Sequence, residues 1–410
     1  MTTENPKFSM GRIEFVALIA MMTATIAFSI DAMLPALPEI AAELSPEIAH
    51  RAPLILTSFV LGMGLGTFFS GPLSDAFGRR NVVFGGAALY SVSAFVAWMS
   101  NSLEVMLVAR IFQGFGASGP RVVAVAIIRD LYAGREMARI MSVVMMVFAL
   151  VPAMAPMLGA GIIHTAGWRA IFIAFMAFSI ISVVWMGLRL PETLPPENRR
   201  PLRARLIIDA VRELVGHRTV RLSILVQSLA LAMLFSMIML VQPIYDTVYG
   251  RGESFPLWFG GIAVVAASAS LINALLVVRY GMRRLVSIAF AFQILLSGAM
   301  YFLNLGALPD PYGFAAFVFF QTCLFFQAGL TLGNLNAIAM EPMGHIAGMA
   351  ASVVGAISTV LAALIASPVG LMFDGTTKPL ALAMLLMACG AYALMLYMGR
   401  MENRQPAAAE

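Results

Sequence analysis

FFSGPLSDAFGRRNVV (residues 68–83) is a short polar stretch between two long apolar runs. Gly71 and Pro72 are expected to end the helix that precedes it, because proline cannot donate to a helical hydrogen bond. Gly78 permits a tight reversal of the chain, because glycine tolerates backbone angles that other residues avoid. The stretch therefore predicts a tight turn between two apolar helices.

The charged residues of this turn do not all have the same explanation. Arg79 and Arg80 suit a cytoplasmic boundary of a membrane, where positive residues collect. Asp75 contributes little to topology and so indicates a specific partner, either Arg79 or the positive N-terminus of a neighbouring helix. The alternative interpretation is a solvated turn whose charges have no function.

The composition explains why such a turn stands out. The chain has 410 residues, of which 60% are hydrophobic and 11% charged, with a mean hydropathy of +0.89. Soluble domains carry about 25% charged residues, so most of this surface must face lipid. The net charge of +5 is spread in short arginine clusters between apolar runs, which argues against a nucleic-acid surface.

Long apolar runs predict the membrane-spanning helices. A span needs about 20 apolar residues, and by this rule the chain holds about twelve, which makes it an all-α membrane protein. Their approximate centres are Met22, Gly62, Tyr90, Gly116, Pro152, Ser179, Ala232, Ala267, Leu295, Gln327, Ile357 and Met387.

Positive residues predict the orientation. With both termini in the cytoplasm, 20 of the 26 Lys and Arg residues fall on inner segments and 4 on outer segments. The first apolar run contains Asp31 and no signal-peptide cleavage pattern, so it is expected to remain as a span. The residues that depart from the inner pattern are Arg51, Arg169, Arg251 and Lys378 on outer segments, and Arg110 and Arg121 within one span.

The chain divides into two halves that echo each other. Residues 190–220 are rich in proline and arginine and are interpreted as a cytoplasmic linker between an N-terminal part, 1–189, and a C-terminal part, 221–410. FGRRNVV and RIFQGFGASG in the first half resemble YGMRRLV and LFFQAGLTLG in the second. Such a parallel repeat is typical of secondary transporters.

Other classes of site lack their residues. GFGASG (114–119) matches a dinucleotide fingerprint but lies within a span, and no phosphate-binding loop follows. Two cysteines and four histidines show no metal-ligand spacing, so we expect no metal, cofactor or disulfide, and no enzyme. GMGLG (62–66) is expected to pack helices within a monomer.

The turn also resembles a known signature. GPLSDAFGRR is similar to the loop 2–3 motif of the major facilitator superfamily, G-x-L-x-D-x-x-G-R-[RK]. The resemblance implies twelve helices in two six-helix bundles around a central cavity, with Asp75 and Arg79 latching the cytoplasmic side. The matching residues are Gly71, Leu73, Asp75, Gly78, Arg79 and Arg80.

Further stretches resemble one subfamily, the Bcr/CflA-type drug:proton antiporters. They are DAMLPALPEI from Asp31, VARIFQGFGAS around Arg110, RDLYAG from Arg129 and MEPMGHIAGMAAS around Glu341. VPAMAPMLGAGI resembles the antiporter motif G-x-x-x-G-P-x-x-G-G. That segment holds Pro152, Pro156 and Gly159, with Val151, Ala155 and Ala160 in place of motif glycines.

Asp31 is the leading candidate for proton coupling. It is the only acidic residue deep in a span, and ionisable residues in such places are by default functional. A buried carboxylate with a cation in reach can change its protonation near neutral pH. Arg110 is expected to lie within reach. The alternative is that Asp31 sits at the outer membrane interface.

Two spans offer polar residues for a substrate. Arg110 and Arg121 are three helical turns apart on the fourth span, with Gln113 near the same face, although Arg121 could instead extend to the interface. The tenth span offers Gln327, Thr331 and Asn334 as neutral hydrogen-bonding groups. Polar contacts between helices are the alternative explanation for these amides.

Together these features predict a proton-coupled exporter of drug-like or small amphipathic compounds. The alternative is an exporter of one endogenous metabolite, such as a sugar, an amino acid derivative or a siderophore-like compound. We expect a multi-pass monomer in a bacterial cytoplasmic membrane, with the lipid bilayer, a small molecule and protons as partners and no nucleic acid.

Overall fold

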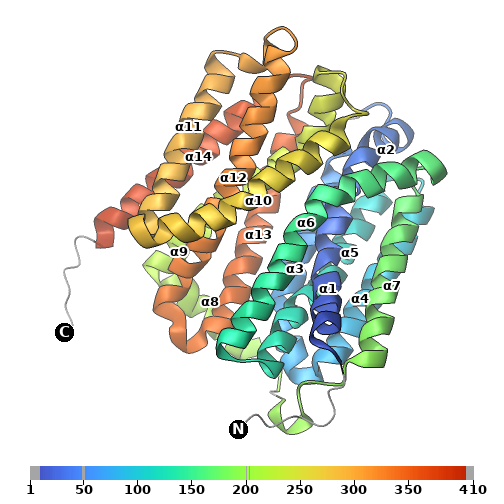
Figure 1. Cartoon of the computed structure of the whole chain (residues 1–410), viewed down its shortest axis with the longest axis vertical. Coiled ribbons are helices and arrows are strands. Elements are labelled where there is room, and N and C mark those ends of the chain that lie inside the picture. Colours follow the sequence, from blue (N-terminus) through green and yellow to red (C-terminus); the bar gives the residue numbers. More distant parts are fainter. Residues whose placement is uncertain (1–9, 49–50, 200, 203, 403–410) are drawn as a thin grey trace. The chain divides into compact units, whose positions relative to one another are not determined.

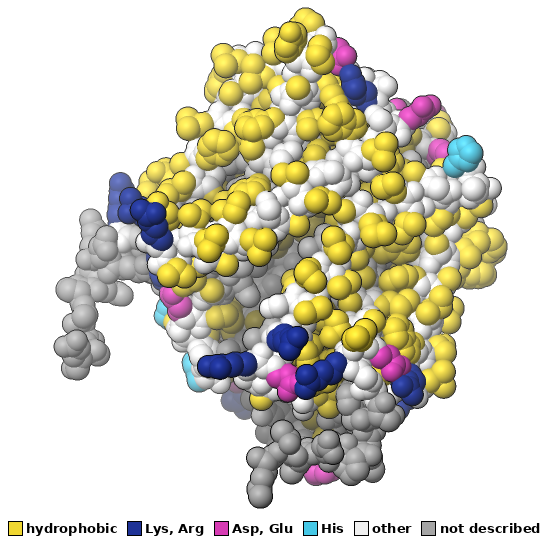
Figure 2. Space-filling model, in the orientation of Figure 1, with side chains coloured by type: hydrophobic (Ala, Val, Ile, Leu, Met, Phe, Trp, Pro, Cys, Tyr) yellow, Lys and Arg dark blue, Asp and Glu magenta, His cyan; other side chains and the backbone are white. Residues whose placement is uncertain are grey.

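The computed structural model describes residues 10–48, 51–199, 201–202 and 204–402. In this part of the chain every regular element is helical, and twelve helical segments are long and apolar enough to cross a membrane. All twelve centres predicted from the sequence fall inside these segments. Figure 2 shows hydrophobic side chains over most of the visible face, with charged side chains gathered in small groups.

The chain forms two compact units. The first comprises Met1–Ser45 and Ser58–Ala204, and the second comprises Pro46–Thr57 and Arg205–Glu410.

The helices of the first part of the chain are shown in blue to green in Figure 1. They are α1 (Arg12–Asp31), η1 (Leu34–Ala36), α2 (Leu37–Leu44), α3 (Leu54–Phe77), α4 (Arg79–Met99), α5 (Leu103–Leu131), α6 (Gly134–Ala166), α7 (Ala170–Arg189) and η3 (Pro196–Asn198).

The helices of the second part follow in green to red in Figure 1. They are α8 (Ala204–Gly216), α9 (Arg218–Pro243), the π-helical turn η4 (Ile244–Val248), α10 (Phe255–Tyr280), α11 (Met282–Phe302), η5 (Leu305–Ala307), α12 (Tyr312–Met340), η6 (Glu341–Ile346), α13 (Ala347–Leu371) and α14 (Lys378–Glu402).

The expected helix end at Gly71 and Pro72 is wrong, because α3 continues through both to Phe77. Membrane helices tolerate proline in their interior. The carbonyl that Pro72 leaves without a helical donor is that of Phe68, whereas the nearby Ser70 and Ser74 hydroxyls donate to the Gly66 and Gly71 carbonyls. The reversal instead occurs at Gly78, whose φ of 95° is accessible to glycine at little cost.

Glycines hold α5 close to its neighbours. A side chain at Gly62 would collide with the backbone of Ile111, and one at Gly114 would collide with the backbone of Phe59, so α3 and α5 touch through their main chains. On another side of α5, Gly116 contacts the backbone of Gly86. Both glycine motifs of the sequence, GMGLG and GFGASG, therefore pack helices in the first unit.

Helix α1 lies inside the first unit and packs against α5, α6 and α7 (Figure 1). Most of its residues are buried, including Phe15, Leu18 and Ile19, which are fully covered. A helix that is apolar all round is stable only when neighbours cover it on several sides. The α1–α5 contact is the one that positions the polar residues described next.

Candidate functional site

A buried polar cluster joins α1, α4 and α5; we call it the Arg110 cluster, comprising Ser29, Tyr90, Arg110 and Gln113. Arg110 is fully buried, and its Nη1 donates to Gln113 Oε1 at 2.9 Å. Its Nη2 donates to the Ser29 carbonyl oxygen at 3.0 Å. The Ser29 and Tyr90 hydroxyls share a hydrogen bond of 2.5 Å.

Aromatic rings complete the surroundings of this arginine. The guanidinium carbon lies 4.3 Å from the centre of the Phe59 ring and 5.9 Å from that of Phe175. Ring faces stabilise a cation more strongly when water is excluded. The cluster thus fixes a planar cation inside the first unit, on the face of α5 that meets α1.

Asp31 is the last residue of α1 and is 5% exposed. The carbonyl that accepts from Arg110 belongs to Ser29, two residues earlier in the same helix. The structure thus buries Asp31 at the end of α1, rather than leaving it on an exposed rim. Direct pairing of the Asp31 carboxylate with Arg110 stays a prediction.

The antiporter-like segment of α6 touches the chain beside Asp31. A side chain at Gly159 would collide with the backbone of Ala32, so the two helices are in main-chain contact there. Pro152 and Pro156 lie inside α6, where neither can donate a backbone hydrogen bond. A change in the packing of α6 would therefore act on the backbone next to Asp31.

Arg121 differs from Arg110 in its surroundings, although both lie on α5. The Arg121 side chain is exposed, and its Nη1 approaches Met63 Sδ at 3.7 Å. Gln113 is fully buried, and its Nε2 has no hydrogen-bond partner. The structure therefore joins Gln113 to Arg110 and does not join either residue to Arg121.

A second charged group surrounds the turn after α3; we call it the Arg79 cluster, comprising Asp75, Arg79, Asp130 and Glu192. Arg79 is 7% exposed and contacts Asp75 Oδ1 at 2.5 Å and Asp130 Oδ2 at 2.9 Å. Asp75 thus has the Arg79 partner that the sequence indicated. Two carboxylates from different helices hold one guanidinium.

Glu192 completes this cluster from the segment after α7. Its carboxylate accepts hydrogen bonds from the backbone N–H groups of Arg79 and Arg80 at 2.9 and 3.1 Å. These are first-turn donors of α4 that have no partner within the helix. A carboxylate at a helix N-terminus also interacts favourably with the helix dipole. The Arg80 side chain donates to the Gly187 carbonyl of α7.

The α12 stripe, Gln327, Thr331 and Asn334, is buried in the second unit. Gln327 Nε2 donates to the Thr331 hydroxyl at 3.1 Å, while Gln327 Oε1 has no partner. Asn334 Nδ2 donates to Asn273 Oδ1 of α10 at 2.7 Å, which is a contact between helices. Glu341 follows α12 and forms an ion pair with Arg283 at 2.7 Å.

Sequence reasoning missed several partners that the structure supplies. Asp130 lies in RDLYAG and Glu192 lies in the PET of the linker, so both belonged to stretches already singled out. Tyr90, Ser29 and Asn273 carried no signal, because one hydroxyl or amide in an apolar span is common. Among the described residues, no group of three His, Cys, Asp or Glu side chains could hold a metal ion.

Comparisons with known proteins agree with this architecture. The family model described as Major Facilitator Superfamily matches residues 17–367. The chain is 30% identical over 377 residues to a bicyclomycin resistance protein homolog of Haemophilus influenzae, covering 90% of this chain and 92% of that protein. It is 25% identical to the chloramphenicol resistance protein CraA of Acinetobacter baumannii, covering 71% and 70% of the two chains.

Solved structures resemble the fold at lower sequence identity. A D-xylose-proton symporter superposes with a TM-score of 0.74 at 14% identity, covering 94% of this chain and 97% of the symporter. The nucleoside transporter NupG gives a TM-score of 0.72 at 13% identity, covering 95% and 99%. At such identities the likeness shows a common fold.

Proposed function

Because the chain belongs to the Major Facilitator Superfamily, we propose that it exports drug-like or small amphipathic compounds across a bacterial cytoplasmic membrane in exchange for protons. The observation that carries the proposal is the near full-length similarity to a bicyclomycin resistance protein homolog. The similarity to CraA, a chloramphenicol resistance protein, supports the same class of substrate.

Asp31 is the proposed proton carrier, and its burial supports this role. A carboxylate without water is stable only as the neutral acid or beside a positive charge. Arg110 is held by the Ser29 carbonyl and by Gln113, and Ser29 precedes Asp31 by two residues in α1. Protonation of Asp31 would therefore change the charge balance around a fixed cation.

The contact between Gly159 and Ala32 offers a route from that charge change to movement. A ligand or proton shifts a conformational equilibrium only through different affinity for the two states. We propose that the α1–α6 contact differs between the protonated and deprotonated states. In this mechanism the antiporter-like segment, with Pro152, Pro156 and Gly159, responds to Asp31.

The Arg79 cluster is the proposed cytoplasmic gate, with Gly71, Gly78 and Arg80 shaping the turn. Arg79 is buried under Asp75 and Asp130, and Glu192 bonds the first turn of α4. Replacing Asp75 with asparagine would remove one charge from this set. We propose that the set stabilises one state of the transport cycle.

Gln113 and Arg121 are the proposed substrate-contacting residues of the first unit, and the α12 stripe is a separate proposal for the second unit. The exposed guanidinium of Arg121 and the unpartnered Oε1 of Gln327 support this assignment. The α12 stripe also supports the second candidate function, export of one endogenous metabolite. Several hydrogen-bonding groups favour a substrate with matching polar groups.

Proteoliposomes with an imposed pH gradient test the function directly. Purified protein should move a chloramphenicol-like or other drug-like compound against its gradient, and collapse of the pH gradient should stop the movement. A polar metabolite panel run in parallel tests the second candidate. Transport that needs no pH gradient would overturn proton coupling, and transport of a single metabolite alone would overturn drug export.

The orientation can be tested by cysteine labelling. We propose that both termini are cytoplasmic, which puts Arg205 inside and Arg251 outside. In a variant without Cys323 and Cys389, a cysteine at Arg251 should react with an impermeant reagent in intact cells. A cysteine at Arg205 should react only after permeabilisation. The reverse pattern would invert the topology.

A further inference from the structure

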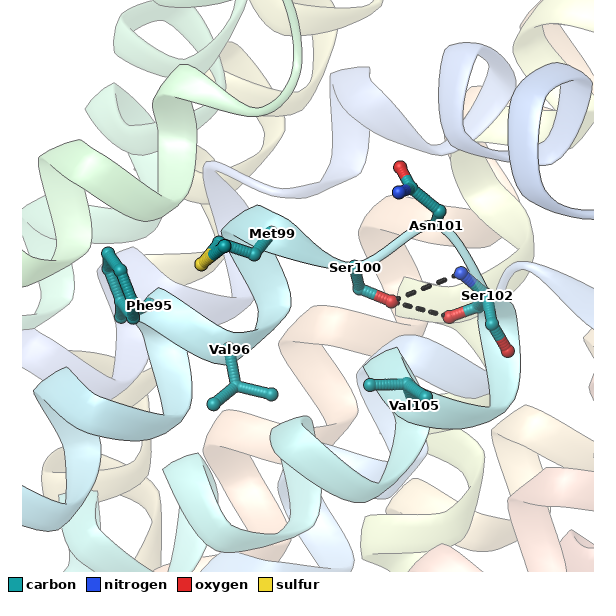
Figure 3. A pocket seen from close by; sticks show the side chains of 7 residues that line it. All are labelled: Phe95, Val96, Met99, Ser100, Asn101, Ser102 and Val105. Atoms are coloured by element: carbon teal, nitrogen blue, oxygen red, sulfur yellow. Dashed lines mark hydrogen bonds between the residues drawn. The ribbon is translucent and has the colours of Figure 1, made fainter.

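An open groove runs along the outward faces of α4 and α5; we call it the α4/α5 groove. It consists of two adjoining hollows of about 500 Å³ and 440 Å³ that share Val96 and Val105. Figure 3 shows the smaller hollow, with Phe95, Val96 and Met99 on α4 facing Val105 on α5. The principal apolar walls are Leu89, Val92, Val96, Val105, Val108 and Phe112.

These walls are unusually exposed for apolar side chains. Val92 is 63% exposed, Met99 60% and Phe112 52%. Both helices are membrane-spanning segments, so the exposed faces of the groove lie at the depth of the bilayer. A hydrocarbon chain is the occupant that such walls accept without leaving a polar group unsatisfied.

One end of the groove is polar. The turn between α4 and α5 holds Ser100, Asn101 and Ser102, and the Ser100 hydroxyl bonds both the backbone N–H and the carbonyl of Ser102 (Figure 3). These two hydrogen bonds fix the conformation of the turn. Glu104 then follows on the first turn of α5 and lines the larger hollow.

The polar end combines both signs of charge. Ser102 Oγ donates to Glu104 Oε2 at 2.9 Å, which orients that carboxylate. Arg169 Nη2 donates to Asn101 Oδ1 and to the Ser100 carbonyl, each at 3.1 Å, while its Nη1 pairs with Glu43 at 2.6 Å. The guanidinium therefore holds the turn and is already neutralised by its own carboxylate. The Asn101 amide nitrogen can still donate to an anionic oxygen. A carboxylate and an anion-binding group therefore stand next to an apolar groove.

We propose that the α4/α5 groove binds one zwitterionic phospholipid whose headgroup ends in a primary ammonium, as in phosphatidylethanolamine. An acyl chain lies along the valines, the ammonium donates to Glu104, and the phosphate accepts from the Asn101 amide, which the Arg169–Glu43 pair holds in place. A choline headgroup lacks N–H donors, and a glycerol headgroup lacks the cation. The site therefore prefers an ethanolamine headgroup over a choline headgroup and a choline headgroup over a glycerol headgroup.

The proposal requires the membrane spans but not drug export. Only the choice of leaflet depends on the proposed orientation. Lipid binding is measured without any transport assay, so failure of one proposal does not imply failure of the other.

Native mass spectrometry of the purified full chain tests the headgroup. Delipidated protein is mixed with phosphatidylethanolamine, phosphatidylcholine and phosphatidylglycerol that carry identical acyl chains. The wild type should favour phosphatidylethanolamine over phosphatidylcholine by about fivefold, the equivalent of one ordinary hydrogen bond that choline cannot donate to Glu104. Glu104→Gln should lose this preference, whereas Glu39→Gln, at an exposed residue of α2, should keep it. An unchanged preference in Glu104→Gln would overturn the headgroup assignment.

A second pair of variants tests the groove itself. Val96→Trp fills the hollows and should reduce the binding of all three lipids to background. Val184→Trp, on an exposed face of α7, should bind lipids as the wild type does. Both should elute as a single folded species. Equal lipid binding by the two variants would overturn the proposal. So would displacement of the lipid by a transported drug, or a dimer of the wild type that Val96→Trp abolishes.

Discussion

The turn at Gly78 and the turn at Gly281 have the same backbone but different electrostatic surroundings. Gly78 has φ 95° and ψ 157°, and Gly281 has φ 77° and ψ 156°. Each precedes a helix of 21 residues, α4 in the first unit and α11 in the second. The two turns are structural counterparts in the two halves of the chain.

The charges that follow these glycines differ in burial. Arg79 is held by two carboxylates, and its side chain is 9% exposed. Arg283 pairs with Glu341, and their side chains are 33% and 43% exposed. A glycine between two apolar helices is therefore enough to produce the same backbone turn in both units. Of these two turns, the one in the first unit holds its arginine more deeply buried.

The same contrast holds for α5 and α12, which are both 29 residues long. Helix α5 buries Arg110, whereas α12 buries Gln327 and Thr331, which are neutral. Charge is expensive to bury in a membrane and is retained where it has a function. The contrast supports our proposal that proton coupling belongs to the first unit, and that the substrate contacts proposed for the second unit are neutral.

The largest effect is expected from Asp31→Asn. It should abolish uphill transport driven by a pH gradient while leaving substrate binding and downhill exchange, because the amide cannot carry a proton. Glu341→Gln, in the second unit, is the matched control and should retain uphill transport. Proteoliposome uptake under an imposed pH gradient measures both. Uphill transport by Asp31→Asn would contradict the proposal that proton coupling belongs to the first unit.

Arg110→Lys should lower the transport rate about tenfold or more, although lysine keeps the positive charge. Lysine lacks the planar fork that bonds Gln113 and the Ser29 carbonyl together. Leaving one of these acceptors unpaired costs about 1–3 kcal/mol. Arg189→Lys, at an exposed ion pair with Glu14, should transport normally. Transport rates and thermal unfolding of both variants check the expectation.

Arg79→Gln should destabilise the protein more than Arg283→Gln. The first change leaves Asp75 and Asp130 without their shared cation, and a partly buried pair of this kind is worth about 1–3 kcal/mol. The second breaks an exposed pair worth at most about 1 kcal/mol. Thermal melts in detergent compare the two. Equal melting temperatures would show that the different burial of the two arginines does not affect stability.

The smallest effect is expected from Gln327→Leu. It should raise the KM of a hydrogen-bonding substrate about fivefold, the equivalent of one ordinary hydrogen bond. The change should leave kcat nearly constant. Gln293→Leu, which also removes a buried amide of the second unit, is the control and should leave KM unchanged. A normal KM for Gln327→Leu would assign that amide to helix packing.

The sequence predicted the fold because its signals are long and repeated. Twenty-residue apolar runs, arginine clusters and the Gly78 turn each depend on local chain properties. The expected end of α3 was wrong because a membrane helix can continue past a proline that removes one backbone hydrogen bond. The reversal occurs instead at Gly78, whose positive φ ends the helix.

The candidate site was predictable only in part. Asp31 and Arg110 were recognisable because charges are rare in spans. Asp75 and Arg79 were recognisable as a motif, but their partner Asp130 lies 51 positions after Arg79 in the chain. Partners that meet only in the folded unit, such as Ser29 and Tyr90, leave no periodic trace in the sequence.

The bond between Glu192 and the first turn of α4 has a mechanical consequence. It fastens the chain three residues beyond the end of α7, and the Thr193 hydroxyl adds a second attachment by donating to Asp130 of α5 at 3.0 Å. Breaking the Glu192 bond alone would therefore leave this segment attached to α5 through Thr193. One carboxylate and one hydroxyl thus prevent the residues directly after α7 from acting as a free tether.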